Sequence, residues 1–296
     1  MRSAVPLFFL LLGCGAPATP TATPAGAPGP PPPPAPAEEP PPPAPPAPAA
    51  PAPGTKPTCP AGMVGIVGGP ATLGESDPAM ITTYGPNTVV PRGEYTLPAY
   101  CIDEWPAPGR AGAAWPTDGL HKRLLRDTVE PLLWAHGRRL CTVAELMRAA
   151  GGASGRRYPW GQVRDTTRCD SKDDAPEVMG TYPDCVSPSG VREVQVRSTW
   201  ARLDATTLAA LTEAGAAAQP GFDGGYAVWG GLVRDDTYYA PTNFGVHFHL
   251  ADAPGFNDDG LRTCAWSGAV SDEQQAGWRA LMDSLAASQS FATLGR

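Results

Sequence analysis

The sequence has little charge, no basic excess and no long hydrophobic run. Charged residues make up 17% of its 296 residues, and the net charge of −7 provides no general attraction to nucleic acid. No run approaches the 20 or so apolar residues that a membrane-spanning helix requires. Cys-x-x-Cys, Gly-x-Ser-x-Gly and His-Glu-x-x-His sequences are also absent, as is a phosphate-binding glycine loop. We therefore do not predict nucleic-acid binding, a zinc or thioredoxin-type site, or these common hydrolytic chemistries.

Proline is abundant but unevenly distributed. Of the 38 prolines, 20 lie between Gly15 and Pro57, whereas all eight tryptophans lie beyond residue 100. A segment of Pro, Ala, Gly and Thr favours extended polyproline II over a packed core. We expect residues 14–57 to form a disordered spacer, residues 58–287 a compact domain and residues 288–296 a tail. Recognition of the spacer by a proline-binding module is the alternative.

Residues 1–13 have the features of a secretory signal peptide. Arg2 precedes the apolar run Val5–Leu12, and a small residue stands just before Cys14. Leu-Leu-Gly-Cys also resembles the bacterial lipobox, whose cysteine becomes the lipidated first residue. The residue after Cys14 is Gly15 and not Asp, which resembles lipoproteins that are sorted to the outer membrane. We expect a lipid anchor at Cys14 and a place in the bacterial envelope, facing the periplasm or the cell surface; the alternative is an ordinary signal peptide.

Six cysteines remain once Cys14 is set aside. An even number in an oxidising compartment is typical of structural disulfides, although six cysteines allow fifteen pairings. We expect the pairs Cys59–Cys101, Cys169–Cys185 and Cys141–Cys264. The first would join two predicted strands, and the second would close a short loop.

Local patterns predict an α+β domain with short strands, few helices and long connections. Apolar runs indicate strands over 63–69 and 95–102, and apolar spacing indicates a helix over 118–136 that is interrupted or restarted at Pro131. Thr142 and Glu145 form a capping-box sequence ahead of a helix that Gly151 and Gly152 end. Asp204 is a cap for another helix, and a last one is expected over 271–285. A domain with so little regular structure needs its disulfides.

One stretch is more specific than these patterns. Gly137–Leu146 (GRRLCTVAEL), followed by Ala-Ala-Gly-Gly and by Tyr-Pro-Trp-Gly at 158–161, resembles the formylglycine-generating enzyme (sulfatase-modifying factor) family. Further landmarks follow the same order. They are residues 63–69, residues 180–183 with 189–191, Gly230-Gly231, and residues 260–264. The resemblance covers 59–267, and it implies a C-type-lectin-like α+β fold.

The resemblance does not extend to the family's catalytic copper site. The family binds copper through two cysteines spaced Cys-x4-Cys after its Arg-Gly-Gly-Ser turn. These places fall near Asp235 and Ala240 here, and Leu232 replaces the serine. Carboxylate and alkyl groups cannot replace thiolate ligands of Cu(I). We therefore predict a divergent member without the family's catalytic residues.

The family's calcium segment is similarly altered. It corresponds to residues 196–200, where the Asn and Glu oxygen ligands are missing and Arg197 is present. Calcium requires several oxygen ligands and is repelled by a cation. We therefore do not expect residues 196–200 to form the calcium site of the family.

Other residues could hold a metal independently of the family. His247 and His249 would share one face of a strand, with Asp252 nearby, which is a donor set suited to non-haem iron. The alternative is a pair of ordinary polar residues. His121 and His136 are expected on the solvent side of a helix. Acidic clusters at 170–174, 235–236 and 257–259 could bind calcium, or they are solvated loop charges.

An aromatic-rich region lies where the family has its substrate groove. Its rings could form a ligand surface or could belong to the domain core. The groove candidates are Trp229, Leu232, Asp235, Tyr238, Tyr239 and Ala240. The first expected function is a non-catalytic binding or structural module for a peptide or glycan, without a cofactor. The alternative is an enzyme: a metal-dependent oxidase that uses His247 and His249, or a formylglycine-generating type with altered chemistry.

Overall fold

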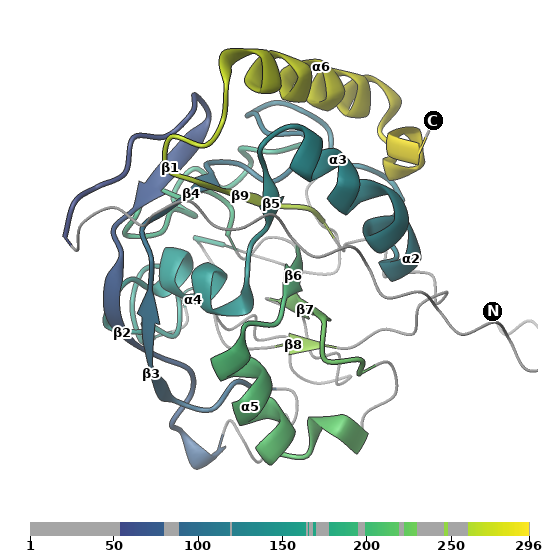
Figure 1. Ribbon diagram of the computed structural model, residues 1–296. Coiled ribbons are helices and arrows are strands. Elements are labelled where there is room, and N and C mark those ends of the chain that lie inside the picture. Colours follow the sequence, from purple (N-terminus) through teal and green to yellow (C-terminus); the bar gives the residue numbers. More distant parts are fainter. Residues whose placement is uncertain are drawn as a thin grey trace, which may run out of the picture. The chain divides into compact units, whose positions relative to one another are not determined.

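The structure is a computed structural model (Figure 1). Its described residues all belong to one compact unit, Pro43–Arg296. They are residues 54–79, 89–118, 120–163, 165, 168–169, 178–194, 199–218, 222–229, 246–247 and 260–295, with only the backbone described at 246–247. The predicted signal peptide, Cys14 and nearly all of the predicted spacer lie outside them.

A four-stranded antiparallel sheet joins segments far apart in the chain. Its order is β1-β4-β9-β5, formed by Met63–Ile66, Tyr100–Asp103, Thr263–Trp266 and Arg139–Leu140. Strand β4 is buried throughout its length, so it forms the centre of this layer. A three-stranded sheet has the order β6-β7-β8, from Thr199–Arg202, Tyr226–Trp229 and Val246–His247.

The two predicted strands near the start of the domain are four strands. The expected strand over 63–69 ends with β1 at Ile66, and β2 begins at Gly69 and runs to Leu73. The expected strand over 95–102 is divided into β3 (Gly93–Leu97) and β4, because Pro98 has no amide for a ladder hydrogen bond. Strands β2 and β3 form a separate antiparallel pair. A Cβ at Gly68 would lie 2.5 Å from the amide nitrogen of Ala99, so the chain between β1 and β2 requires glycine at this position.

The helix predicted over 118–136 is a continuous helical segment that changes its winding. It comprises α2 (Lys122–Leu124), a π-helical turn (Leu125–Val129) and α3 (Glu130–Ala135). The amide of Glu130 bonds to the carbonyl of Leu125, five residues back. Pro131 lies in the first turn of α3, where a missing amide costs little. A new α-helical stretch therefore starts next to Pro131, in agreement with the predicted restart, and a π turn stands where an interruption was the alternative.

The predicted helix starts are confirmed by their caps. Helix α4 (Val143–Gly151) begins with the full Thr142–Glu145 capping box, and Gly152 ends it at φ 72°. Asp204 caps α5 (Ala205–Glu213), which a short 3-10 turn (Ala216–Ala218) follows. Helix α6 (Asp272–Ser288) starts with a second capping box, from Ser271 and Gln274. No helix of the described part is long and apolar enough to cross a membrane.

Residues 288–295 of the predicted tail are part of the fold. After α6, residues Phe291–Gly295 form a 3-10 turn in which Phe291 and Leu294 are buried. The Asp118 carboxylate accepts hydrogen bonds from the amides of Phe291 and Ala292, at 2.7 and 3.2 Å. The chain end is thus tied to the segment that precedes α2.

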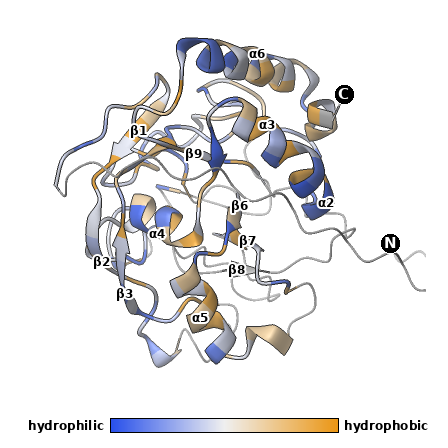
Figure 2. Ribbon diagram, in the orientation of Figure 1, coloured by the Kyte–Doolittle hydropathy of each residue, from blue (hydrophilic) through white to orange (hydrophobic). Residues whose placement is uncertain are grey.

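Two large hydrophobic clusters form the core. The first lies among β1–β4, α4, α5 and the β6–β7 strands, and the second lies among the α2–α3 segment, α6 and the 3-10 turn that follows it. Figure 1 shows α6 lying beside α3 across one end of the four-stranded sheet. The α2 turn and the start of α6 are hydrophilic, whereas α5 is largely hydrophobic (Figure 2).

The disulfides are the three predicted pairs. Cys59–Cys101 ties the segment before β1 to β4, and Cys141–Cys264 joins the chain after β5 to β9. Cys169–Cys185 lies in a third, smaller cluster with Trp115 and Met179. Cys59 precedes β1, so the first pair links a strand to a loop and not two strands as expected.

Candidate functional site

A cavity of about 360 Å³ lies between α6, the end of β4 and the loop that follows β4. We call its buried polar side chains the floor, its apolar side chains the wall, and its exposed charged side chains the rim. The lining residues used below are Asp103, Arg138, Gln275, Trp278, Arg279 and Met282, together with Ala107–Arg110 and Asp283. Such a volume falls within the range of small-ligand pockets.

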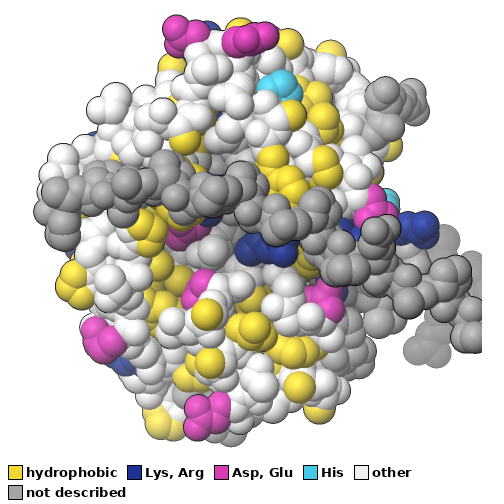
Figure 3. Space-filling view, viewed as in Figure 1, with side chains coloured by type: hydrophobic (Ala, Val, Ile, Leu, Met, Phe, Trp, Pro, Cys, Tyr) yellow, Lys and Arg dark blue, Asp and Glu magenta, His cyan; other side chains and the backbone are white. Residues whose placement is uncertain are grey.

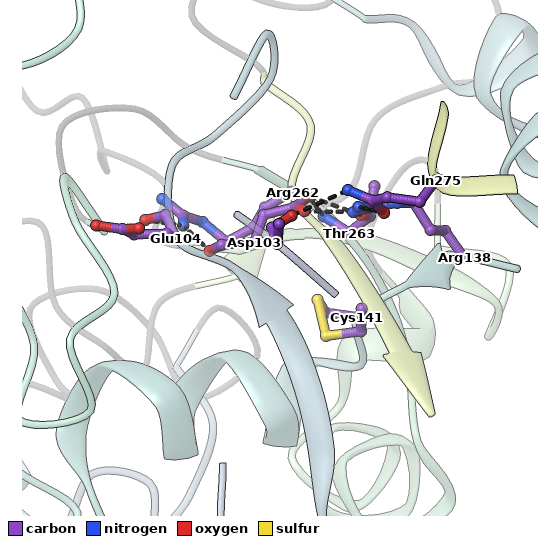
Figure 4. A network of polar contacts seen from close by, with 9 residues as sticks. Asp103, Glu104, Arg138, Cys141, Arg262, Thr263 and Gln275 are labelled. Carbon is purple, nitrogen blue, oxygen red and sulfur yellow. Dashed lines mark hydrogen bonds and ion pairs between the residues drawn. A yellow bond between two sulfur atoms is a disulfide. The ribbon is translucent and has the colours of Figure 1, made fainter. Parts of the chain in front are cut away.

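The floor of the cavity is a buried hydrogen-bond network (Figure 4). The Arg138 Nη1 donates to Asp103 Oδ1 at 2.5 Å and to Thr263 Oγ1 at 2.9 Å. The other Asp103 oxygen accepts from the amide and the hydroxyl of Thr263, at 2.8 and 2.6 Å. The Arg138 side chain is 2% exposed and that of Asp103 10%. Both carboxylate oxygens are therefore already occupied.

Gln275 connects this floor to α6. Its Oε1 accepts from Arg138 Nη2 at 3.1 Å, and its Nε2 donates to the carbonyl of Ala61 at 2.9 Å. The Arg138 guanidinium also lies 4.7 Å from the centre of the Trp278 ring, an attractive cation–π distance. These contacts fix α6 over the cavity floor.

A second buried arginine supports the network from behind. Arg262 is 2% exposed and donates to the carbonyls of Asp103 and Arg192 at 2.7 and 2.8 Å. Burial lowers the pKa of Arg262 to about 10, an effect that the charge of Asp103 opposes. Arg262 therefore remains a cation at neutral pH.

Glu193 is the acidic partner of this region. Its Oε1 accepts from the amides of Gly180 and Tyr182, whereas its Oε2 has no hydrogen-bond partner in the described structure. Burial raises the pKa of the Glu193 carboxyl, although these amides and Arg262 oppose the shift. A buried carboxyl with one unpaired oxygen favours its protonated form.

The rim of the cavity carries two arginines. Arg110 is paired with Asp283, and both side chains are largely exposed, at 60% and 62%. Arg279 is exposed on α6 and has no ion pair with another described residue. The rim therefore has an uncompensated positive charge.

A second polar network lies between α3 and the β6–β7 strands. The Arg202 Nε and Nη2 donate to the two oxygens of Glu130 at 2.7 and 2.5 Å, and the Tyr226 hydroxyl donates to Glu130 at 2.5 Å. Burial and the Glu130 carboxylate raise the pKa of Tyr226 well above its ordinary value. Tyr226 therefore stays protonated and acts as a donor.

On the face shown in Figure 3, charged side chains of both signs are scattered among neutral atoms.

The disulfides bear directly on the copper chemistry of the family. The six cysteines beyond Cys14 form the three disulfide bonds, and a disulfide sulfur is not the thiolate that Cu(I) requires. These six residues therefore do not fit a thiolate copper site. Cys169 and Cys185, which could in principle converge on a metal, are bonded to each other.

Most of the predicted groove residues lie beyond the described structure. Trp229, at the end of β7, is fully buried in the first core cluster, so for this ring the core alternative holds. Tyr226 is likewise a core residue. The structure does not describe Leu232, Asp235, Tyr238, Tyr239 or Ala240.

The metal candidates cannot be assembled from the described residues. His247 lies in β8, where only its backbone is described, and His249 and Asp252 lie outside the described residues. Of the acidic clusters, Asp170, Asp173 and Asp174 lie outside them too, as do 235–236 and 257–259. In the parts that are described, no three His, Cys, Asp or Glu side chains are grouped to hold a metal ion.

The two helical histidines have structural contacts that differ from the predicted solvent positions. His121 is the N-cap of α2, and its Nδ1 accepts from the amide of Leu124 at 3.1 Å. His136 ends α3, and its ring lies 6.2 Å from that of Trp278. Both are half-buried.

Sequence reasoning missed the cavity because its residues come from four distant segments. In the sequence, Asp103 directly follows the predicted strand 95–102, and Arg138 lies within the family-like stretch. Each residue has no other local signal. Their pairing, 35 residues apart, requires strands β4, β9 and β5 to be neighbours. That neighbour relation is not readable from local patterns.

Three landmarks of the family resemblance are adjacent in space. The landmark at 137–146 contains β5, and the closing landmark contains the start of β9; the two strands pair through Arg139 with Cys264 and Leu140 with Thr263. The opening landmark contains β1, which joins the same sheet through β4. No protein-family model matches this chain, and no curated protein matches it significantly in sequence.

Proposed function

We propose that this chain is a lipid-anchored protein of the bacterial envelope whose folded domain binds a peptide or glycan without chemically altering it. The signal-peptide pattern and the lipobox-like sequence at Cys14 support the anchor. The proline-rich segment then acts as a spacer between the membrane and the domain. Three disulfides suit a domain that folds in an oxidising compartment.

The domain is proposed to be a divergent relative of formylglycine-generating enzyme with a C-type-lectin-like fold. The mixture of helix and strand and the meeting of three family-like landmarks in one sheet support this relationship. The Cys141–Cys264 bond links the central landmark to the closing one. Fold similarity does not carry the activity with it.

The observation that carries the non-catalytic proposal is the pairing of all six cysteines beyond Cys14. Oxidation of a substrate cysteine by a Cu(I) site requires thiolate ligands, and these six are bonded to one another. The cavity floor points the same way, because Asp103 and Arg138 already satisfy each other. An acid–base catalyst needs a group that is able to exchange protons with a substrate.

The first experiment tests the disulfides and the enzyme alternative together. Purified full-length protein is titrated for free thiols under denaturing conditions, analysed for bound metal, and incubated with a cysteine-containing peptide and a copper salt. We expect no free thiol in the mature protein, whose Cys14 sulfur would carry the lipid, no stoichiometric metal and no conversion of the peptide cysteine. Stoichiometric iron or copper that is lost in a His247→Ala/His249→Ala variant, or formylglycine in the peptide, would overturn the proposal.

The second experiment tests the anchor. In a bacterial host, Cys14→Ala is expected to move the protein from the membrane fraction to the soluble fraction. Gly15→Ala, which keeps the cysteine, is the matched control and should remain with the membrane. Membrane association of the Cys14→Ala variant would show that the chain is held there by something else.

A further inference from the structure

We infer that the cavity beneath α6 binds the C-terminal residue of a peptide, with the carboxylate at the arginine rim and an apolar side chain against the inner wall. This inference rests on the proposed binding function and narrows it to one ligand class. None of the residues that line the cavity is among the groove positions suggested by the family resemblance.

The charges around the cavity favour an anion. Its lining includes the carboxylates of Asp103 and Asp283 and the cations of Arg110, Arg138 and Arg279. Arg138 forms an ion pair with Asp103, and Arg110 forms one with Asp283. Arg279 is the lining cation without a carboxylate partner among the described residues. A single carboxylate would balance the charge of Arg279.

The rim arginines are able to reach a ligand at little cost. The Arg110–Asp283 pair is more than half exposed on both sides, and exposed pairs contribute little stability. Arg110 can therefore turn from Asp283 to a bound carboxylate. Arginine is well suited to this role because its guanidinium can donate two parallel hydrogen bonds to a carboxylate.

The remaining wall requires an apolar group on the ligand. Ala107, Pro108, Trp278 and Met282 line the cavity alongside its polar floor. A small inorganic anion would leave this wall unfilled, and a neutral glycan would leave Arg279 without a partner. A C-terminal residue provides a carboxylate and an apolar side chain on the same carbon. Capture of a terminal carboxylate is an established mode of peptide recognition.

The test compares N-acetylphenylalanine with N-acetylphenylalaninamide, which differ only in the charged group. Binding to the full-length protein is measured by calorimetry and by ligand-detected NMR. We expect the carboxylate to bind about ten-fold more tightly than the amide, the effect of one charge-assisted contact. In Arg279→Gln the two affinities should come within about two-fold of each other, while Arg92→Gln, an exposed arginine outside the cavity, changes neither.

A second variant separates a lost site from a lost fold. Arg279→Glu reverses the rim charge at an exposed position, so the circular dichroism spectrum should be unchanged while binding of the carboxylate is lost. Equal binding of carboxylate and amide, binding that survives Arg279→Glu, or binding of neither compound at millimolar concentration would overturn the inference. So would binding of an N-acetylglucosamine trimer that Met282→Trp blocks. None of these outcomes resembles metal-dependent turnover, the result that overturns the proposed function itself.

Discussion

Two arginine–carboxylate networks in this domain use the same components in different surroundings. Under α6, Arg138 pairs with Asp103 and lies over Trp278; between α3 and β6, Arg202 pairs with Glu130 and lies over Tyr226. The Arg138 side chain is 2% exposed and that of Arg202 30%. The first pair is therefore almost wholly withdrawn from water, and the second keeps one partner hydrated.

This difference in hydration determines what each network can contribute. Two buried charges lose their hydration, and only their mutual attraction and additional hydrogen bonds offset this cost. Asp103 accepts additional hydrogen bonds from Thr263, and Arg138 donates one to Gln275. Breaking such a pair leaves a charge with nothing to replace water. Arg202, being part-exposed, can recover solvent when its partner is lost.

The largest effect is therefore expected from Asp103→Asn. The substitution keeps the shape of the side chain but leaves Arg138 as an uncompensated buried charge, and breaking a buried pair costs about 3–5 kcal/mol. Urea unfolding of the disulfide-intact protein, followed by far-ultraviolet circular dichroism, measures the loss. A cost below about 1 kcal/mol would mean that water already reaches Arg138, and the contrast between the two networks would fail.

A smaller loss is expected from Glu130→Gln. It removes the charge-assisted hydrogen bonds to Arg202 and one acceptor for Tyr226. Such bonds contribute about 1.5–3 kcal/mol each. The contribution is smaller here because Arg202 is partly exposed. Tyr226→Phe, which removes only the hydroxyl, is the matched control and should cost about 1 kcal/mol. The same unfolding measurement applies. Equal costs for Asp103→Asn and Glu130→Gln would show that burial does not distinguish the pairs.

Local features of the fold were predictable because neighbouring residues determine them. Thr142 with Glu145, Asp204 and Ser271 each satisfy free amides at a helix start, a contact that needs residues only three apart. The disulfide pairing was also predicted. The π turn before Pro131 was not, because a proline in a helical pattern does not specify how the preceding turn adapts.

The candidate site was much less predictable. Thr263 lies 125 residues from Arg138 and Gln275 lies 137 residues from it. Their meeting depends on the strand order β1-β4-β9-β5, which no local signal determines. The buried 3-10 turn after α6 was missed for a similar reason, since Phe291 is fixed by Asp118 from the other end of the domain.

The polar region behind the cavity predicts a pH effect. Burial raises the pKa of Glu193 above the ordinary glutamate value of 4.5. Between that value and the raised one, the folded state binds more protons than the unfolded state, so the stability contribution of Glu193 falls as pH rises through this window. Glu193→Gln resembles the protonated form and should remove this slope. Unfolding free energies of both proteins across pH 4 to 8 test it; parallel pH profiles would contradict a raised pKa.

The smallest effect is expected at the cavity rim. Asp283 forms the same kind of pair with Arg110 as Asp103 forms with Arg138, but both partners are more than half exposed. Water and salt already screen this pair, so Asp283→Asn should change the free energy of unfolding by no more than about 0.5 kcal/mol. The residual difference should vanish in 1 M NaCl, whereas the cost of Asp103→Asn should persist because a buried charge is poorly screened. If salt erased both costs equally, the depth of Arg138 below the surface would not be what distinguishes the two pairs.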